Sequence, residues 1–220
     1  MHSRPVVIVL AAGRSARFDG QGNKLMQNLG PLSVLGTTVS HALATDLPVV
    51  LVTTEQLAPE ALRVIAARDL VVLPDSVAAM RGVGFSMAMG VSARPEARGW
   101  VMLPGDMPMV QPPTIRAVAQ ALGQHAVAYP QYGGHAGRPM GFAAELYSEL
   151  ILLSGDHAAR RLGARYPAHA IDVPDPGVLM DVDTPDDLRA LRQSLQLPLA
   201  AVVPQSPDPG GHSSPGPRSH

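Results

Sequence analysis

The first residues of the chain that could do chemistry lie just after its first apolar run. Val6–Leu10 consists of five aliphatic residues, which predict a strand buried on both faces, as in a parallel sheet. Small and cationic residues follow it: Ala11, Ala12, Gly13, Arg14, Ser15, Arg17 and Lys24. Small side chains let a backbone approach a ligand, and successive N–H groups can form an anion-binding hollow. Because three cations add charge, this pattern favours a polyphosphate-binding loop over a loop that is basic by chance.

Two familiar phosphate loops are excluded. A dinucleotide-binding turn needs G-x-G-x-x-G directly after the strand, and this chain has only Gly13 there. A P-loop needs Gly-Lys followed by Ser or Thr, whereas Lys24 stands between Asn23 and Leu25. An NAD-dependent oxidoreductase is therefore poorly supported, and the loop belongs to a third kind.

A carboxylate follows another predicted strand. Asp106 comes soon after the apolar run Trp100–Leu103, at the end of a parallel strand where open α/β sheets bind ligands. A carboxylate facing a polyphosphate loop is repelled unless a divalent cation lies between them. We therefore expect Asp106 to be a ligand of Mg²⁺, which takes one or two carboxylates together with phosphate oxygens. The alternative is an aspartate that serves only the turn.

A second group of carboxylates precedes the last predicted helix. In a strand, Asp181 and Asp183 would point to the same face, which makes either a candidate second metal ligand. Thr184 followed by Pro185, with Asp187 three residues after Thr184, predicts a helix start that resembles a capping box. Asp186 and Asp187 thus have a structural interpretation, because acidic groups complement the helix dipole at this end.

Composition limits the function classes. The chain has 220 residues, with 17 Lys and Arg against 18 Asp and Glu, and this balance argues against a nucleic-acid partner. It has no cysteine, which excludes thiolate chemistry and cysteine-ligated metals. No apolar run approaches the roughly 18 residues that a membrane helix needs. We expect a cytoplasmic protein.

Alternating strands and helices predict an α/β fold with a single doubly wound, mostly parallel sheet. We expect a helix at Pro59–Arg68, a glycine-rich turn at Gly82–Ser86 before a helix, and a small hairpin lid at Gln131–Pro139. This domain covers 1–195. The segment 196–220, rich in Pro, Gly and Ser, is predicted to be a disordered tail.

Five spaced motifs together resemble the MobA-like NTP transferase family, and are most similar to the molybdenum cofactor cytidylyltransferases. The resemblance covers about 6–191 and rests on Leu10-Ala11-Ala12-Gly13-x-Ser15-x-Arg17 with Lys24, Pro104-Gly105-Asp106-Met107-Pro108, Gly137-Arg138-Pro139 with Phe142, Gly155-Asp156 with Ala159-Arg160, and Asp181-Val182-Asp183-Thr184-Pro185. It implies a Rossmann-like fold of the GT-A type. It also implies transfer of a nucleoside monophosphate from an NTP to a phosphomonoester, here molybdopterin, with release of pyrophosphate and with a molybdoenzyme or chaperone as recipient of the product.

The resemblance also implies site residues. Lys24, Arg17 and Asp106 would be catalytic, and Mg²⁺ would be held by Asp106 with Asp183 or Asp181. The nucleotide would be bound by Leu10, Ala11, Ala12, Gly13, Arg14, Ser15, Arg17, Lys24, Gly105 and Asp106. The second substrate would be bound by Gly137, Arg138, Pro139, Asp156 and Arg160.

The chain departs from the family pattern mainly on the side of the second substrate. Arg138 stands where the family has His, Gly82–Ser86 replaces Gly-Met-Gly-Ser-Ser, and Ala158 replaces a glycine. Within the family, Ala12 favours CTP, because guanylyltransferases carry glycine there. The alternatives are a guanylyltransferase, a sugar-phosphate nucleotidyltransferase, a glycosyltransferase with Asp181 and Asp183 as its D-x-D motif, and a non-catalytic nucleotide-binding protein or cofactor chaperone.

Overall fold

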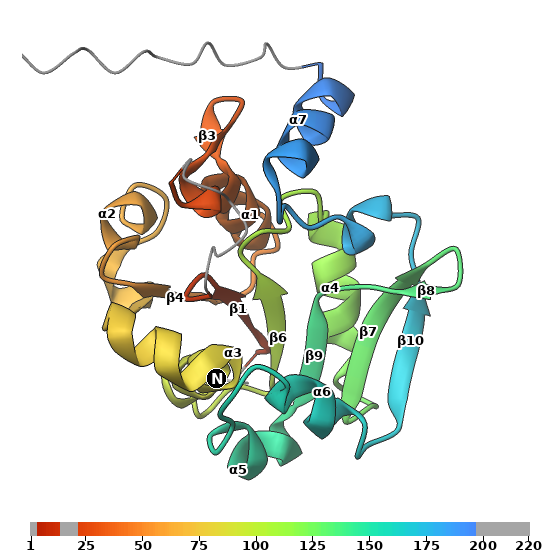
Figure 1. Cartoon of the computed structure of the whole chain (residues 1–220). Coiled ribbons are helices and arrows are strands. Elements are labelled where there is room, and N and C mark those ends of the chain that lie inside the picture. The colour runs from red at the N-terminus through yellow and green to blue at the C-terminus, as the bar shows by residue number, and fades with distance from the viewer. Residues whose placement is uncertain (1–3, 14–21, 197–220) are drawn as a thin grey trace, which may run out of the picture.

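A computed structural model describes residues 4–13 and 22–196 of the chain (Figure 1). The predicted loop residues Arg14, Ser15 and Arg17 lie outside the described residues. So does all of the predicted tail except Gln196.

The centre of the fold is one mixed sheet, to which the described residues contribute eight strands in the order β10-β7-β9-β6-β1-β4-β5, with β8 paired to β7 (Figure 1). The strands are β1 (Val6–Leu10), β4 (Val49–Thr54), β5 (Leu70–Leu73), β6 (Gly99–Pro104), β7 (Val127–Tyr132), β8 (His135–Ala136), β9 (Met140–Ala143) and β10 (Ala168–Asp172). Strand β1 is parallel to both β4 and β6, and β9 is antiparallel to β6 and β7. A separate short hairpin joins β2 (Asn28–Leu29) to β3 (Leu32–Ser33).

Helices cover both faces of the sheet. One face carries α1 (Val34–Leu43), the single turn α2 (Ala58–Ala61), α4 (Pro112–Ala121) and α7 (Pro185–Ser194). The other carries α3 (Asp75–Ser92), α5 (Tyr147–Leu150) and α6 (Ala158–Gly163), which lie toward the viewer in Figure 1. Four 3₁₀ turns complete the described elements: η1 (Lys24–Met26), η2 (Ala67–Asp69), η3 (Ala144–Leu146) and η4 (Pro176–Leu179). The predicted fold class is therefore confirmed.

The buried first strand explains this layering. Side chains alternate along a strand, so Val7 and Val9 pack under α1 and α4 while Val6 and Ile8 pack under α3. All four are buried, as are the central residues of β4 and β6 beside them. Strands β1 and β6 therefore end together at one edge of the sheet, with Leu10 opposite Pro104.

The predicted hairpin forms at the far side of the sheet. Strands β7 and β8 are joined by Gly133 and Gly134, both with positive φ, which suits a two-residue turn. Beyond β8, a side chain at Gly137 would meet the carbonyl of Val178 at 2.6 Å, so this close approach requires glycine. The hairpin is present; its role as a lid stays a prediction.

Three local predictions were wrong. The predicted helix Pro59–Arg68 contributes only to the turn Ala58–Ala61 and to the 3₁₀ turn Ala67–Asp69. A short helix depends on packing, and between these two turns only Ile65 is buried. Gly82–Ser86 lies inside α3, where a break replaces the predicted loop. Asp181 and Asp183 lie in an irregular segment rather than in a strand.

Among the described residues, the helices are all too short or too polar to cross a membrane.

Candidate active site

The carboxyl end of β6 places Asp106 beside the end of β1. The Gly105 N–H donates to the Leu10 carbonyl at 2.9 Å, and the Thr38 hydroxyl of α1 donates to the Gly105 carbonyl at 3.0 Å. A side chain from α1 and a backbone group from β1 thus fix the turn that carries Asp106. This is the ligand-binding edge of an open α/β sheet.

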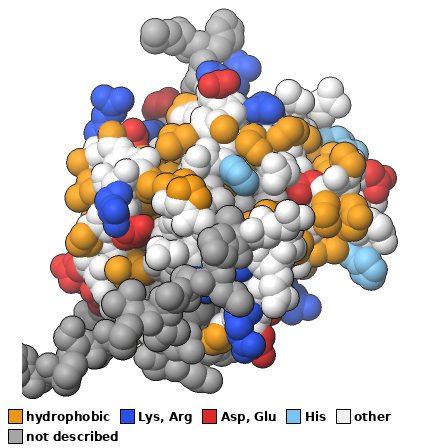
Figure 2. Space-filling model, turned by 90° about the horizontal axis from the view of Figure 1, so that it is seen from above, with side chains coloured by type: hydrophobic (Ala, Val, Ile, Leu, Met, Phe, Trp, Pro, Cys, Tyr) orange, Lys and Arg blue, Asp and Glu red, His pale blue; other side chains and the backbone are white. Residues whose placement is uncertain are grey.

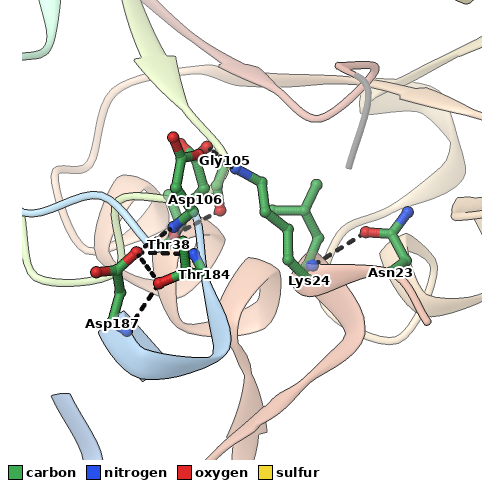
Figure 3. Close-up of polar contacts among 9 residues, drawn as sticks. Asn23, Lys24, Thr38, Gly105, Asp106, Thr184 and Asp187 are labelled. Carbon is green, nitrogen blue, oxygen red and sulfur yellow. Dashed lines mark hydrogen bonds and ion pairs between the residues drawn. The ribbon is translucent and has the colours of Figure 1, made fainter. Parts of the chain in front are cut away.

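Lys24 joins this turn to the start of the last helix. Its Nζ donates to Asp106 Oδ2 at 2.5 Å and to Asp183 Oδ1 at 2.7 Å, and the lysine is buried (Figure 3). We call Lys24, Asp106 and Asp183 the charged centre. Lys24 is positioned by Asn23, whose side chain accepts from the Leu25 N–H and caps the turn η1, which begins at Lys24.

The charged centre alters the proton affinity of Lys24 and of the neighbouring Asp181. Burial acts to lower the pKa of Lys24, but Asp106 and Asp183 outweigh it and hold that pKa above its usual range. Partial burial, followed by the nearby charge of Asp183, raises the pKa of Asp181. Lys24 is therefore a cation at neutral pH, and Asp181 lies close enough to the centre to sense its charges.

The three candidate metal ligands are brought together only in part. Among the residues that the structure describes, no three acidic or histidine side chains converge as an ion requires. Two of them, Asp106 and Asp183, already approach one cation, the Lys24 ammonium. Carboxylate oxygens suit Mg²⁺ and similar hard cations, so this pair fits a divalent ion once Lys24 has moved aside.

The start of α7 supports Asp183. The Thr184 hydroxyl and the Asp187 carboxylate form the predicted capping box, which is confirmed. Asp187 Oδ2 also accepts from the Asp183 N–H at 3.1 Å, and the Val182 N–H donates to the Asp106 carbonyl at 2.9 Å. The start of the helix therefore holds the backbone of Asp183, and the residue before Asp183 bonds the backbone of Asp106.

One cavity lies on the loop side of the charged centre. It has a volume of about 500 Å³, and its lining includes Ala12, Gly13, Asn23, Thr54 and Asp75. Ala12 and Gly13 belong to the predicted phosphate loop, and Asn23 precedes Lys24 in the chain. We call it the loop cavity.

Two further cavities lie on the other side and share lining residues. The first, of about 620 Å³, includes Asp106, Asp181, Gly137 and Arg138. The second, of about 330 Å³, is lined by polar groups (Arg138, Asp156, His157, Arg160) and by apolar ones (Leu10, Val83, Met87, Met102, Pro104, Met140, Phe142). We call the first the junction cavity and the second the apolar chamber; Arg138, Val83 and Pro104 line both.

Figure 2 shows the molecule from above, as seen from the top of Figure 1. Among the described side chains in this view, Lys and Arg lie at separate places rather than in one continuous patch. The positive charge that the described side chains place on this face is therefore local.

The structure groups most of the predicted residues. Ala12 and Gly13 line the loop cavity, whereas Leu10 lines the apolar chamber. Of the residues predicted for the second substrate, Gly137, Arg138, Asp156 and Arg160 line the two cavities beyond Asp106, and Pro139 is buried beside them in the chain. The roles assigned to these residues stay predictions.

Sequence reasoning missed several lining residues. Thr54 ends β4, and the rule that ligands bind at the ends of parallel strands could have identified it. Met102, Met140 and Phe142 carry no comparable signal, because apolar residues in strands look the same whether they face a core or a cavity. His157 lies next to Asp156 and was not singled out.

Known proteins resemble this chain in sequence and in structure. The sequence model of one protein family, the MobA-like NTP transferase domain, matches residues 7–171. The crystal structure of Rv0371c from Mycobacterium tuberculosis H37Rv is 29% identical with a TM-score of 0.76, covering 88% of this chain and 99% of that one. The structure of the same protein in complex with manganese is 28% identical with a TM-score of 0.72, and the match covers 87% of this chain and 100% of that one.

A nucleotidyl transferase from Methanothermobacter thermautotroptrophicus is 20% identical with a TM-score of 0.72, and the match covers 88% of this chain and 98% of that one. At this identity it shows the fold alone. A comparison with curated proteins found no match. The family model covers most of the chain, and the sheet that it spans carries the charged centre and its cavities. The chain therefore belongs to the MobA-like NTP transferase family.

Proposed function

We propose that the chain transfers CMP from CTP to molybdopterin and releases pyrophosphate. The observation that carries this proposal is the position of the charged centre between two binding spaces. Asn23, next to Lys24, lines the loop cavity, while Asp106 lines the junction cavity. A transferase needs this arrangement, because its two substrates must meet at the reacting phosphorus.

The reaction requires positioning and charge more than proton transfer. A phosphomonoester has its second pKa at about 6, so its oxygen is already an anion at neutral pH. That oxygen forms a bond to the α-phosphorus of the NTP, and the bond from this phosphorus to the oxygen of the β-phosphate breaks, with its electron pair leaving on pyrophosphate. Lys24 and Arg17 are the cations proposed to stabilise the charge on the phosphates.

A divalent cation is part of the proposal. Mg²⁺ held by Asp106 and Asp183, with Asp181 beside them, would neutralise charge on the triphosphate. The manganese complex of the Mycobacterium tuberculosis protein supports the use of such an ion. Lys24, released from the carboxylates, would be free to face the phosphates.

CTP is favoured by the loop. Ala12 lines the loop cavity, and the Leu-Ala-Ala-Gly form of this loop is typical of the cytidylyltransferases in the family. GTP is the alternative. A cytoplasmic location, where the enzyme meets NTPs, belongs to the same proposal.

The apolar chamber supports an acceptor with a flat ring that can pack on apolar side chains. Its lining includes apolar side chains such as Met102, Met140 and Phe142, and its polar groups include two arginines. A sugar would leave many hydroxyl groups against these side chains without partners, which is costly. A pterin that carries a phosphomonoester suits the chamber better, because its ring can pack on methionine and its phosphate can bind Arg138.

The test is pyrophosphate release with Mg²⁺ or Mn²⁺. CTP, GTP, ATP and UTP are each combined with molybdopterin and with a panel of sugar phosphates, and Asp106→Asn serves as the matched inactive variant. The proposal expects release with CTP and molybdopterin together, and little with either alone.

Other outcomes choose among the alternatives. Release with GTP would indicate a guanylyltransferase, and release with a sugar phosphate would keep the reaction and discard molybdopterin. Tight NTP binding without turnover, measured by calorimetry, would favour a non-catalytic nucleotide-binding protein or cofactor chaperone.

A further inference from the structure

Helix α3 is broken at Gly82 and bonded there to the segment before α6. Gly82 has φ 70° and ψ −179°, which are not helical values. The Gly155 N–H donates to the Arg81 carbonyl at 2.8 Å, and the Gly84 N–H donates to the Gly155 carbonyl at 3.1 Å. The Val83 N–H donates to Asp156 Oδ1 at 3.2 Å. We call these three hydrogen bonds the break contact.

The break contact supplies partners that the broken helix lacks. A break leaves N–H and carbonyl groups without their usual partners within the helix. Here the carbonyl before Gly82 and the two N–H groups after it all bond to Gly155 or Asp156. Asp156 thus caps the second half of α3 as an N-cap aspartate caps an ordinary helix.

Glycine is required at this position for two reasons. Its positive φ is one that other residues rarely adopt. A side-chain carbon at Gly82 would also lie 2.4 Å from Asp156 Oδ1 and 2.9 Å from the carbonyl carbon of Gly155. The break and the docked segment therefore depend on each other.

The break separates two binding spaces. The half of α3 before Gly82 contributes Asp75, Ala78 and Ala79 to the loop cavity. The half after it contributes Val83 and Met87 to the apolar chamber. The docked segment contributes Asp156, His157 and Arg160 to the same chamber. The break contact thus fixes one wall of the chamber against another, on the side of the second substrate.

We propose that Asp156 is a positioning residue for the acceptor, and not a group that binds it. By accepting from the Val83 N–H, Asp156 holds His157 and Arg160 in the wall of the apolar chamber, where Arg160 and Arg138 face an anionic phosphomonoester. This inference rests on the proposed function in one respect, that the chamber receives the acceptor. It revises the role that the sequence motif predicted for Asp156.

The first measurement is hydrogen exchange on the protein without substrates. Asp156→Ala removes the side-chain bond, whereas Asp156→Asn keeps an oxygen that can accept it. We expect faster exchange in peptides that cover 82–87 and 153–157 for the alanine variant alone, and no change over Gly99–Pro104. Arg160→Ala is the matched control, because it removes a chamber cation and should leave exchange unchanged.

The second measurement is an NMR titration that monitors the binding of phenyl phosphate. This probe is a phosphomonoester with a flat apolar body. Asp156→Ala should weaken binding by about tenfold, since small displacements at a site cost that much or more. Arg160→Ala should weaken it by about as much, because it removes a cation that can bind the phosphate. Asp156→Asn should stay within about threefold, and CTP binding should stay within about twofold in all variants, because distant sites are independent.

These measurements separate the inference from the proposed function. Neither requires turnover, so absence of pyrophosphate release would overturn only the reaction. Unchanged exchange in Asp156→Ala would overturn the inference, and so would wild-type protein that does not bind phenyl phosphate. Equal loss of binding in the asparagine and alanine variants, with normal exchange in the asparagine variant, would also overturn the inference, because binding would then depend on the carboxylate without depending on the break contact.

Discussion

The charged centre and the apolar chamber differ in how their cations are held. Lys24 is buried, and two carboxylates lie within 2.7 Å of its ammonium. Arg138 and Arg160 are exposed, and within the described part of the chain neither forms an ion pair. A ligand of the centre must exchange existing charge contacts, whereas a ligand of the chamber has only to replace water.

Under the proposed function, this difference determines how each side of the site would select its ligand. Breaking a buried ion pair without replacing it is expensive, so the centre favours a ligand that supplies both negative phosphates for Lys24 and a cation for the carboxylates. A metal-bound nucleotide meets both conditions. The chamber can select only through shape and through the position of its arginines, which is why its supporting contacts matter.

The largest effect is expected for Asp106→Asn, which removes one charge of the centre with little change in size. Transfer should slow by about a thousandfold, because the carboxylate proposed to hold Mg²⁺ is lost, and with it the positive charge that would stabilise the reacting phosphate. Pyrophosphate release under single-turnover conditions measures it. Asp172→Asn, on the exposed end of β10, is the matched control and should transfer normally. Near-normal turnover of a folded Asp106→Asn protein would show that the centre is structural.

Lys24→Met should have two opposite effects. Transfer should fall by about a hundredfold, because a cation for the phosphates is lost. Binding of Mn²⁺ without nucleotide should tighten by about tenfold, since the ammonium no longer competes for Asp106 and Asp183. Electron paramagnetic resonance of free Mn²⁺ measures this binding. Weaker Mn²⁺ binding in the variant would mean that lysine and metal do not share a site.

Arg138→Ala tests the chamber side, where a smaller effect is expected. The KM for the acceptor should rise by about tenfold with little change in the KM for NTP, because Arg138 lines both cavities beyond Asp106. Arg138→Lys keeps the charge but not the planar fork, so an intermediate KM is expected. Steady-state kinetics with each substrate varied separates the two constants. A selective rise in the KM for NTP would assign Arg138 to the triphosphate.

Local patterns predicted the frame of the site. The apolar run of β1 and the position of Asp106 after β6 followed from rules about buried strands and strand ends, and Thr184 with Asp187 formed the predicted cap. Each of these signals lies within a few residues of the feature that it predicts.

Contacts between distant segments could not be predicted in the same way. Lys24 was assigned to phosphates, yet its partners in the structure stand 82 and 159 residues further along the chain. The break at Gly82 depends on Gly155 and Asp156, which supply the missing hydrogen bonds from another segment. A glycine in a helical pattern shows that a break is permitted, but only its partners decide that it occurs.

The smallest effect is expected at the cap that supports the centre. Asp187→Ala should lower the free energy of unfolding by about 1 kcal/mol and slow transfer by less than about tenfold, because Asp187 fixes the backbone of Asp183 without contacting a ligand. The hydrogen bond from Thr184 lowers the pKa of Asp187. Its contribution is therefore fully present above about pH 4 and is lost as the pH falls through the lowered pKa.

Urea unfolding at pH 7 and at successively lower pH measures this difference between wild type and variant. Asp186→Asn is the matched control, since Asp186 is exposed and pairs only with Arg189 among the described residues. If Asp187→Ala slowed transfer as much as Asp106→Asn does, the cap would belong to the charged centre itself. The charged centre would then include the start of α7, and this helix start would stand with Lys24 on the paired side of the contrast with the apolar chamber.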